Sequence, residues 1–297
     1  MTIEWTSIRF GVEIEYVGGT PDEVELLPGW TMARDELQID DTGRESGSEL
    51  QTPPLSWVDR EQLSIMLERL QASGAAANWS CGLHVHVDLS AWGAPIVPAL
   101  IDSAMQMQDA LRQLLQMSPH RALFCPPVIE AMRGRFKLEP GPGAVRNAGR
   151  PQSHRCGINV AAFYDIGTVE IRYANGSLAY DEVIRTVELC LRFVAAVGAG
   201  AGNQLPNDPL PLARRLGAPE AGYPQASEPP RWYRERMWLE DALIPVFAPM
   251  IPELVPSGEI HHILPGSEGL IVAIENPEGQ LSRFTFRATA EGWEKVV

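Results

Sequence analysis

The stretch SCGLHVHVDLS, residues 80–90, decides the fold of this chain because it alternates apolar and polar side chains over most of its length. Leu83, Val85 and Val87 occupy one set of alternate positions, and the other set includes His84 and His86. Successive side chains of a β-strand point to opposite faces, so this pattern predicts a strand with one buried apolar face and one face that carries both imidazoles. The polar face is either a plain solvated surface or a binding surface, and this strand alone leaves both interpretations open.

Three other predicted strands carry charged side chains in the same alternating manner. Glu13 and Glu15 lie in FGVEIEY, Glu49 lies in GSELQT, and Glu170 and Arg172 lie in TVEIRY. Residues two apart in a strand point to the same side and are separated by roughly 7 Å. Two carboxylates about 6 Å apart repel each other by about 3 kcal/mol at an effective dielectric constant of about 20. A cation, an arginine or full exposure to water relieves this repulsion.

Taken singly, each of these charged pairs also fits a solvated strand face. Four strands that each place an acid or an imidazole on a non-apolar face together favour a shared binding site. The set is rich in carboxylates, and oxygen ligands favour Mg²⁺ or Mn²⁺ over Zn²⁺. A zinc hydrolase built on the two histidines is the alternative that this ligand set disfavours.

The rest of the sequence predicts helices and strands in irregular order, which indicates an α+β fold with a largely antiparallel sheet. Helices are expected over 56–74, with Ser56 and Asp59 as a capping box, and over 96–117, 180–197 and 231–247. A long loop is expected from Pro126 to Pro151, followed by a strand over 157–163. Residues 133–155 are rich in glycine and arginine, so they are a candidate lid over a polyphosphate, with a solvated loop as the alternative. The segment 200–230 is rich in proline, and the tail 269–297 predicts a β-meander with its turn at NPEG.

The composition restricts the partners and the location of the protein. A formal net charge of −14 argues against nucleic acid or an anionic membrane surface as the main partner. The first ten residues, MTIEWTSIRF, lack the apolar stretch of a secretory signal peptide, and no apolar run reaches the roughly 20 residues that span a bilayer. The cysteines show no CxxC spacing and fit reduced thiols, so a cytoplasmic location is expected. Lysine occurs only at Lys137 and Lys295, so arginine would carry out most phosphate binding.

Five segments, in order, resemble the amidoligase family: FGVEIE, SELQTPPL, CGLHVHVD, an arginine followed by GIN, and TVEIRYANGSL. The resemblance extends over residues 8 to about 195. This family is a branch of the carboxylate–amine ligase superfamily, which includes glutamine synthetase and glutamate–cysteine ligase. GLHVHVDLS is also similar to the Gly-x-His-x-His segment of glutamine synthetases. Two segments depart from the family pattern: DELQID stands where the family has Asp-x-Ser, and Gly176-Ser177-Leu178 stands where it has Gly-Thr-Leu.

The resemblance implies an α+β fold in which a largely antiparallel sheet curves into a glutamine-synthetase-like catalytic half-barrel with helices packed on its outer face. Residues 1–200 would form this amidoligase-like catalytic domain. The sequence beyond it predicts a Pro-rich connection and helix over 201–249, and a small β-rich C-terminal module, the β-meander, over 250–297.

The resemblance also implies the residues of the site. Five side chains would ligate two or three Mg²⁺ ions, with Mn²⁺ as an alternative: Glu13, Glu15, Glu49, His84 and Glu170. Arg155 and Arg172 would contact nucleotide phosphates and take part in catalysis, and Arg121 and Arg135 are further candidates for nucleotide binding. His86 would lie near the substrate carboxylate and take part in catalysis, and Asn159 is a second substrate-binding candidate. A surface arginine at Arg121, and an amide that satisfies a neighbouring backbone group at Asn159, are equally good interpretations.

The function that follows from this resemblance is an ATP- and Mg²⁺-dependent ligase that joins a carboxylate to an amine through an acyl phosphate. Its substrate would be a small amino acid or a peptide, with a protein substrate left open. A phosphotransferase on the same scaffold and a non-catalytic binding protein that retains the fold are the alternatives. No nucleic-acid or membrane partner is expected, and a homo-oligomer is left open.

Overall fold

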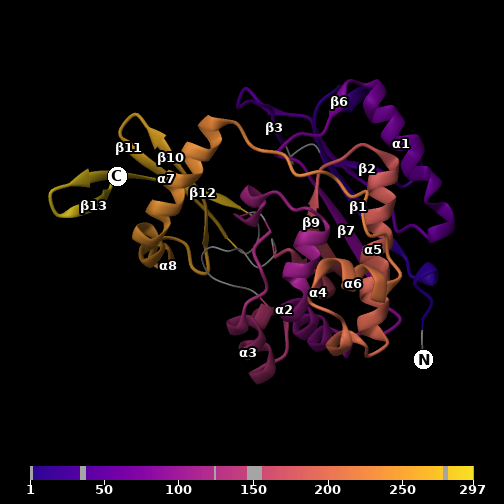
Figure 1. The fold of residues 1–297 in the computed structure, drawn as a ribbon. Helices are drawn as coiled ribbons and strands as arrows, with labels where there is room; N and C mark the ends of the chain where they lie inside the picture. Colours follow the sequence, from indigo (N-terminus) through magenta and orange to yellow (C-terminus); the bar gives the residue numbers. More distant parts are fainter. Residues whose placement is uncertain (1–2, 34–37, 124, 146–155, 277–279, 297) are drawn as a thin grey trace. The chain divides into compact units, whose positions relative to one another are not determined.

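The computed structural model describes residues 3–33, 38–123, 125–145, 156–276 and 280–296 (Figure 1). The described residues divide into two compact units: unit 1 extends to Pro229, and unit 2 starts at Pro230. Each unit contains its own hydrophobic core. The Pro-rich segment after residue 200 belongs to unit 1, because Leu205, Leu212 and Tyr223 are buried in the core of that unit.

A mainly antiparallel sheet forms the centre of unit 1. In the described residues it has seven strands, in the order β2-β5-β1-β7-β9-β8, with β6 paired to β1. The strands are β1 (Phe10–Gly18), β2 (Thr31–Ala33), β5 (Ser48–Gln51), β6 (Ala75–Ala76), β7 (Gly82–Asp88), β8 (Ile158–Asn159) and β9 (Thr168–Asn175). All the described pairings in this sheet are antiparallel. A separate pair, β3 (Gln38–Ile39) and β4 (Glu45–Ser46), is antiparallel as well.

The helices of unit 1 pack against the sheet and against one another. They are α1 (Glu61–Ala72), α2 (Ile96–Leu114), α3 (Glu130–Leu138), α4 (Ala162–Ile166), α5 (Tyr180–Gly198) and α6 (Pro209–Leu216). Helix α5 contacts β1 and β7, and α2 contacts β9, α5 and α6 (Figure 1). A mixed fold of antiparallel sheet and helices, as the sequence predicts, is therefore confirmed.

The period-two pattern of the strands explains how the sheet divides an apolar face from a polar face. In β1, Phe10, Val12, Ile14 and Tyr16 are all buried in the core, and the residues between them are partly exposed. Burying large apolar side chains stabilises each strand by about 1.5–3 kcal/mol per side chain. The apolar face is packed against the helices in one continuous core, so the opposite face is the one on which polar side chains collect.

Two predicted segments of unit 1 are different in the structure. The expected loop from Pro126 to Pro151 contains helix α3 and a short 3-10 helix over Pro142–Val145, because Met132 and Phe136 are four residues apart and bury one helical face. The strand expected over 157–163 is confined to β8, and the chain continues into α4. Residues 146–155, the C-terminal part of the candidate lid over 133–155, lie outside the described residues.

Unit 2 is a helix packed on a β-meander. Its elements are α7 (Arg231–Phe247), α8 (Ile251–Leu254), β10 (Glu259–Gly266), β11 (Gly269–Glu275), β12 (Leu281–Thr289) and β13 (Gly292–Lys295). Within the described residues the four strands pair in sequence order, and every pairing is antiparallel. Phe247 is fully buried at the end of α7, and its ring lies 5.0 Å from that of Phe286 and 5.2 Å from that of Trp293. The predicted helix over 231–247 and the predicted meander are confirmed, whereas the NPEG turn falls largely outside the described residues.

Two further expectations concern the whole chain. All four cysteines lie among the described residues and are buried, and no disulfide bond joins them. Among the described residues, no helix combines the length and the apolar composition needed to cross a membrane.

Candidate metal centre

Strand pairing brings glutamates and histidines from distant parts of the sequence onto one face of the unit 1 sheet. In the antiparallel register, Glu13 of β1 lies opposite His84 of β7, and Glu15 lies opposite Glu49 of β5. His86 lies opposite Glu170 of β9 in the next pair of strands. Side chains directly opposite each other in antiparallel strands are about 5 Å apart at Cβ. The face that carries these groups is therefore continuous across four strands.

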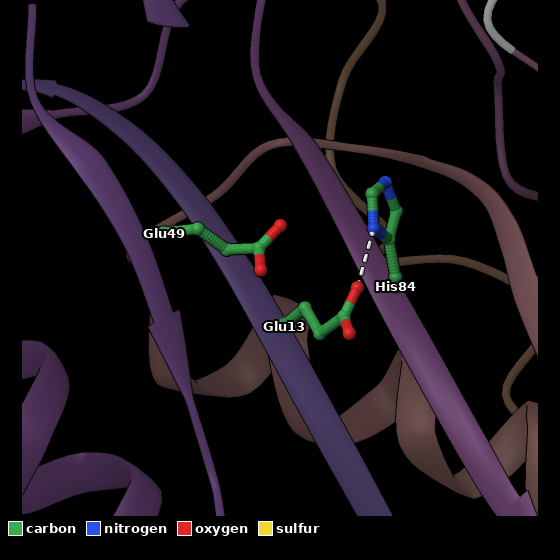
Figure 2. A group of neighbouring side chains, drawn as sticks. All are labelled: Glu13, Glu49 and His84. Atoms are coloured by element: carbon green, nitrogen blue, oxygen red, sulfur yellow. Dashed lines mark hydrogen bonds and ion pairs between the residues drawn. The ribbon is translucent and has the colours of Figure 1, made fainter. Parts of the chain in front are cut away.

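Glu13 lies at the centre of the cluster because it contacts both histidines. Its Oε2 lies 3.0 Å from His84 Nδ1, and its Oε1 lies 3.2 Å from His86 Nε2. Figure 2 shows Glu13, Glu49 and His84 directed toward a common point, with the Glu13–His84 interaction drawn. The Nδ1 of His86 lies 3.0 Å from Thr168 Oγ1, so both ring nitrogens of His86 have partners.

Two groups of side chains have the spacing of metal ligands. In the first group, one ligand atom each from Glu13, Glu49 and His84 lie within 4.8 Å of one another. In the second group, Glu13, His86 and Glu170 satisfy the same limit. Glu13 belongs to both groups. Carboxylate oxygens dominate the donors, and this chemistry fits Mg²⁺ or Mn²⁺ better than it fits Zn²⁺.

Glu170 and Arg172 lie on β9 at the side of the cluster away from Glu49. Both oxygens of Glu170 accept hydrogen bonds. Arg172 Nη1 donates to Oε1, and Asn159 Nδ2 donates to Oε2 over 2.8 Å. The Asn159 carbonyl accepts from Ala161 N at 3.0 Å, so this amide links the β8 turn to the site carboxylate. Glu170 is only 4% exposed, so these donors replace the water that would otherwise solvate its charge.

Glu15 approaches the cluster from its other end. Its Oε2 accepts a hydrogen bond from Gly82 N, and its Oε1 lies 3.8 Å from His84 Nε2. Glycine at position 82 leaves room for two neighbouring side chains, because a Cβ there would come within 2.8 Å of His84 Nε2 and would also collide with Arg121 Nη2. Among the described residues, neither group with metal-ligand spacing includes Glu15.

The environment holds the central carboxylates in their ionised form. Burial raises the pKa of Glu13, but hydrogen bonds with His84 and His86 outweigh it and hold that pKa well below the ordinary carboxyl value. Burial also raises the pKa of Glu170, but the positive charge of Arg172, together with His84 and His86, outweighs burial and lowers that pKa below the ordinary carboxyl value. Burial lowers the pKa of His86, whereas its hydrogen bond to Glu13 and the charge of Glu170 raise it by more.

Charge on this face is unbalanced in favour of the carboxylates. The side chains of Glu13, Glu15, Glu49 and Glu170 are four carboxylates, and two guanidinium groups accompany them: Arg172 is hydrogen-bonded to Glu170, and Arg121 lies next to Gly82 and His84. Carboxylates this close repel one another, and divalent cations relieve this repulsion where water cannot enter. The residues present therefore fit a site for divalent metal ions.

Of the remaining predicted site residues, Arg121 lies beside the cluster. It is 3% exposed and donates from Nη1 to Cys81 O over 2.8 Å and from Nη2 to Arg172 O over 3.3 Å. A Cβ on Gly82 would come within 2.9 Å of both terminal nitrogens of Arg121 and within 2.8 Å of His84 Nε2, so the guanidinium lies on the side of the sheet that carries His84. Arg135 lies on α3, where its Nε donates to Ala144 O over 3.2 Å. Arg155 lies outside the described residues.

The sequence interpretation missed three polar residues around the cluster. Gln51 adjoins Glu49 on β5, Thr31 lies opposite Gln51 on β2, and Thr168 holds His86. The period-two rule places Gln51 and Thr168 on the polar face, because Gln51 is two residues beyond Glu49 and Thr168 is two residues before Glu170, but it gives no signal for Thr31 and does not show which contacts Gln51 makes.

Comparison with known proteins supports the resemblance found in the sequence. A family model described as "Putative amidoligase enzyme" matches residues 23–194, a range that includes Glu49, His84, His86 and Glu170 and begins after β1. No curated protein matches the chain. One solved structure that is similar is "Crystal structure of the complex between Prokaryotic Ubiquitin-like Protein Pup and its Ligase PafA", at 14% identity and a TM-score of 0.28. The similarity covers 72% of this chain and 52% of the other, so the chain spans about half the length of that protein.

Proposed function

This chain belongs to the amidoligase family of carbon–nitrogen ligases, and from that premise we propose that it is an ATP- and Mg²⁺-dependent carboxylate–amine ligase. It would activate a substrate carboxylate as an acyl phosphate, which an amine then attacks to give an amide or peptide-like bond. The observation that carries this proposal is the convergence of Glu13, Glu49, His84, His86 and Glu170 into two overlapping groups of metal ligands.

The metal ligands in this proposal are Glu13, Glu49 and His84 in one group, and Glu13, His86 and Glu170 in the other. Bound Mg²⁺ neutralises the charge of the nucleotide phosphates and so favours transfer of the terminal phosphoryl group. Glu15 supports the first group, since its contacts to Gly82 N and His84 fix the start of β7. We expect any third ion to involve Glu15.

His86 and Arg172 would orient the reacting groups. Thr168 and Glu13 hold the two nitrogens of His86, so the ring has a fixed orientation next to Glu170 and could order a substrate carboxylate. Arg172 is directed at Glu170 and retains further N–H groups for phosphate oxygens. Asn159 would act through Glu170 and also border the substrate. Arg155 and Arg135 stay candidates for nucleotide contact, and the burial of Arg121 favours a positioning role for it.

The family also suggests how the polar face is used. We expect the sheet of unit 1 to curve into a half-barrel like that of glutamine synthetase, with the acidic cluster on its inner wall and the helices on its outer face. The substrate would be an amino acid, a peptide or a protein segment whose carboxylate reaches that wall.

The test is a screen of amino acids and peptides for stimulated ADP release in the presence of Mg²⁺ and ATP. Glu13→Ala should abolish the stimulated release, because it removes a ligand shared by both groups. Glu170→Ala should do so because the second group then retains only Glu13 and His86. Glu68→Ala, on the exposed side of α1, is the control and should leave the rate unchanged.

Mass analysis of the product completes the test. A condensed product, lighter than the sum of its acid and amine by one water, is expected. Accumulation of a phosphorylated compound without condensation would instead identify a phosphotransferase. Failure of the wild-type protein to bind Mg²⁺–nucleotide under any condition would refute both activities.

A further inference from the structure

A short chain of hydrogen bonds extends from the proposed metal centre to the edge of the sheet. Gln51 Nε2 donates to Glu49 Oε1 over 2.7 Å, and Thr31 Oγ1 donates to Gln51 Oε1 over 3.1 Å. Thr31 lies opposite Gln51 in the pairing of β2 with β5, and Glu13 lies opposite Gln51 on the other side. The three side chains therefore follow one another across the polar face.

The direction of these bonds is fixed by chemistry. A carboxylate can only accept, so the contact with Glu49 requires the NH₂ group of Gln51. The amide oxygen then faces Thr31, and only a hydroxyl that donates can satisfy it there. Glu49 thus selects the orientation of the Gln51 amide, and Thr31 satisfies the amide oxygen that this orientation leaves facing β2.

We propose that Gln51 and Thr31 are positioning residues that hold Glu49 in the orientation required for metal binding. This proposal rests on the proposed function, in which Glu49 is a metal ligand. Glu49 is 6% exposed and lies opposite another carboxylate, Glu15, which repels it. A donor is needed to hold it in place, and an amide supplies one without the positive charge of lysine or arginine, which would compete with a divalent cation.

The test measures Mn²⁺ binding to the full-length protein by electron paramagnetic resonance, which reports free Mn²⁺ directly and requires no substrate. Gln51→Leu removes the donor and should weaken the affinity for Mn²⁺ about tenfold, the lower end of the effect of losing a partner of a metal ligand. Thr31→Val should produce a smaller loss, because Gln51 keeps its bond to Glu49 but its amide oxygen loses the donor that holds it in place. Thr31→Ser keeps the hydroxyl and should bind Mn²⁺ with wild-type affinity.

The decisive comparison is the double variant. If Thr31 acts only through Gln51, the variant with both Gln51→Leu and Thr31→Val should bind Mn²⁺ no more weakly than Gln51→Leu alone. Gln113→Leu, on the exposed side of α2, is the matched control and should bind like wild type. Thermal unfolding of each variant checks that the fold is intact, and Thr31→Val is a conservative change at an exposed position.

The outcomes separate this proposal from the one it rests on. An unchanged affinity of Gln51→Leu for Mn²⁺, or additive losses of affinity in the double variant, would overturn the positioning role of Gln51 and Thr31 while leaving the metal centre in place. Absence of Mn²⁺ binding by the wild-type protein would overturn both the metal centre and the positioning role of Gln51 and Thr31.

Discussion

His86 is the residue whose titration the structure predicts most directly. Its hydrogen bond to Glu13 and the nearby charge of Glu170 outweigh burial and raise its pKa in the folded, metal-free protein above the ordinary 6.5. A histidine with a raised folded pKa binds its proton more tightly in the folded state than in the unfolded state. The contribution of protonated His86 to the free energy of unfolding is therefore complete below about pH 6.5, and it is lost as the pH rises through the pKa that His86 has in the folded protein.

We predict that the metal-free protein loses stability as the pH rises from about 6.5, by up to about 1.4 kcal/mol per pH unit while His86 titrates. His86→Gln should flatten this decline. Urea unfolding in EDTA between about pH 6 and about pH 9 measures it. His120→Gln is the control, because burial lowers the pKa of His120 and its effect on stability has the opposite sign. An unchanged slope in His86→Gln would contradict the assigned contacts.

Among individual residues, the sequence predicted the charged side chains of the site better than their neutral neighbours. Glu13, His84 and Glu170 stand out because a charged side chain between buried apolar residues is unusual in a strand. Gln51 and Thr31 are ordinary polar residues whose importance depends on which strand lies beside which. That register is fixed by the packed sheet and is not visible in either segment alone.

One buried side chain from a connecting element links β7 to β9 beside the site, in addition to the backbone pairing of these two strands. Arg121, on the 3-10 helix Pro119–Leu123, donates to the carbonyl of Cys81, just before β7, and to the carbonyl of Arg172 within β9. Its guanidinium is buried, so it substitutes for water at both carbonyls.

Arg121→Met should therefore destabilise the fold by at least about 1–3 kcal/mol, because it leaves buried carbonyls without a donor. Arg121→Lys should recover only part of the loss, since a single ammonium group cannot reproduce the geometry of the guanidinium. Chemical unfolding measures the change in stability, and equilibrium binding of a nucleotide analogue measures the alternative role. Normal stability with lost nucleotide affinity would show that Arg121 contacts the nucleotide after all.

Helices and strands were predicted correctly where the apolar pattern repeats over many residues, and incorrectly where it repeats over few. Helices α2 and α5 each extend over 19 residues and were found from their apolar spacing. Helix α3 spans only nine residues within a stretch rich in glycine and proline, and its two buried side chains, Met132 and Phe136, are too few to establish a period. The strand predicted over 157–163 is interrupted because Asn159 turns the chain by accepting from Ala161 N.

Over the whole molecule, two separate cores explain why the proposed chemistry is confined to unit 1. The core of unit 1 supports every described residue of the cluster through β1, β5, β7 and β9. The core of unit 2 consists of α7, α8 and the meander. Resemblance to the family ends near residue 195, whereas unit 1 extends to Pro229, so the sequence alone did not assign the Pro-rich segment or α7 to a core. That assignment depends on which core each segment joins.

The central claim is that residues far apart in the sequence form one centre for divalent ions, and anomalous diffraction from crystals grown with Mn²⁺ and a non-hydrolysable ATP analogue tests it most directly. We predict anomalous peaks between Glu13, Glu49 and His84 and between Glu13, His86 and Glu170, and their loss in Glu13→Ala. Saturating Mn²⁺ that gives no peak at these side chains, or peaks only at other positions on the protein, would contradict the account.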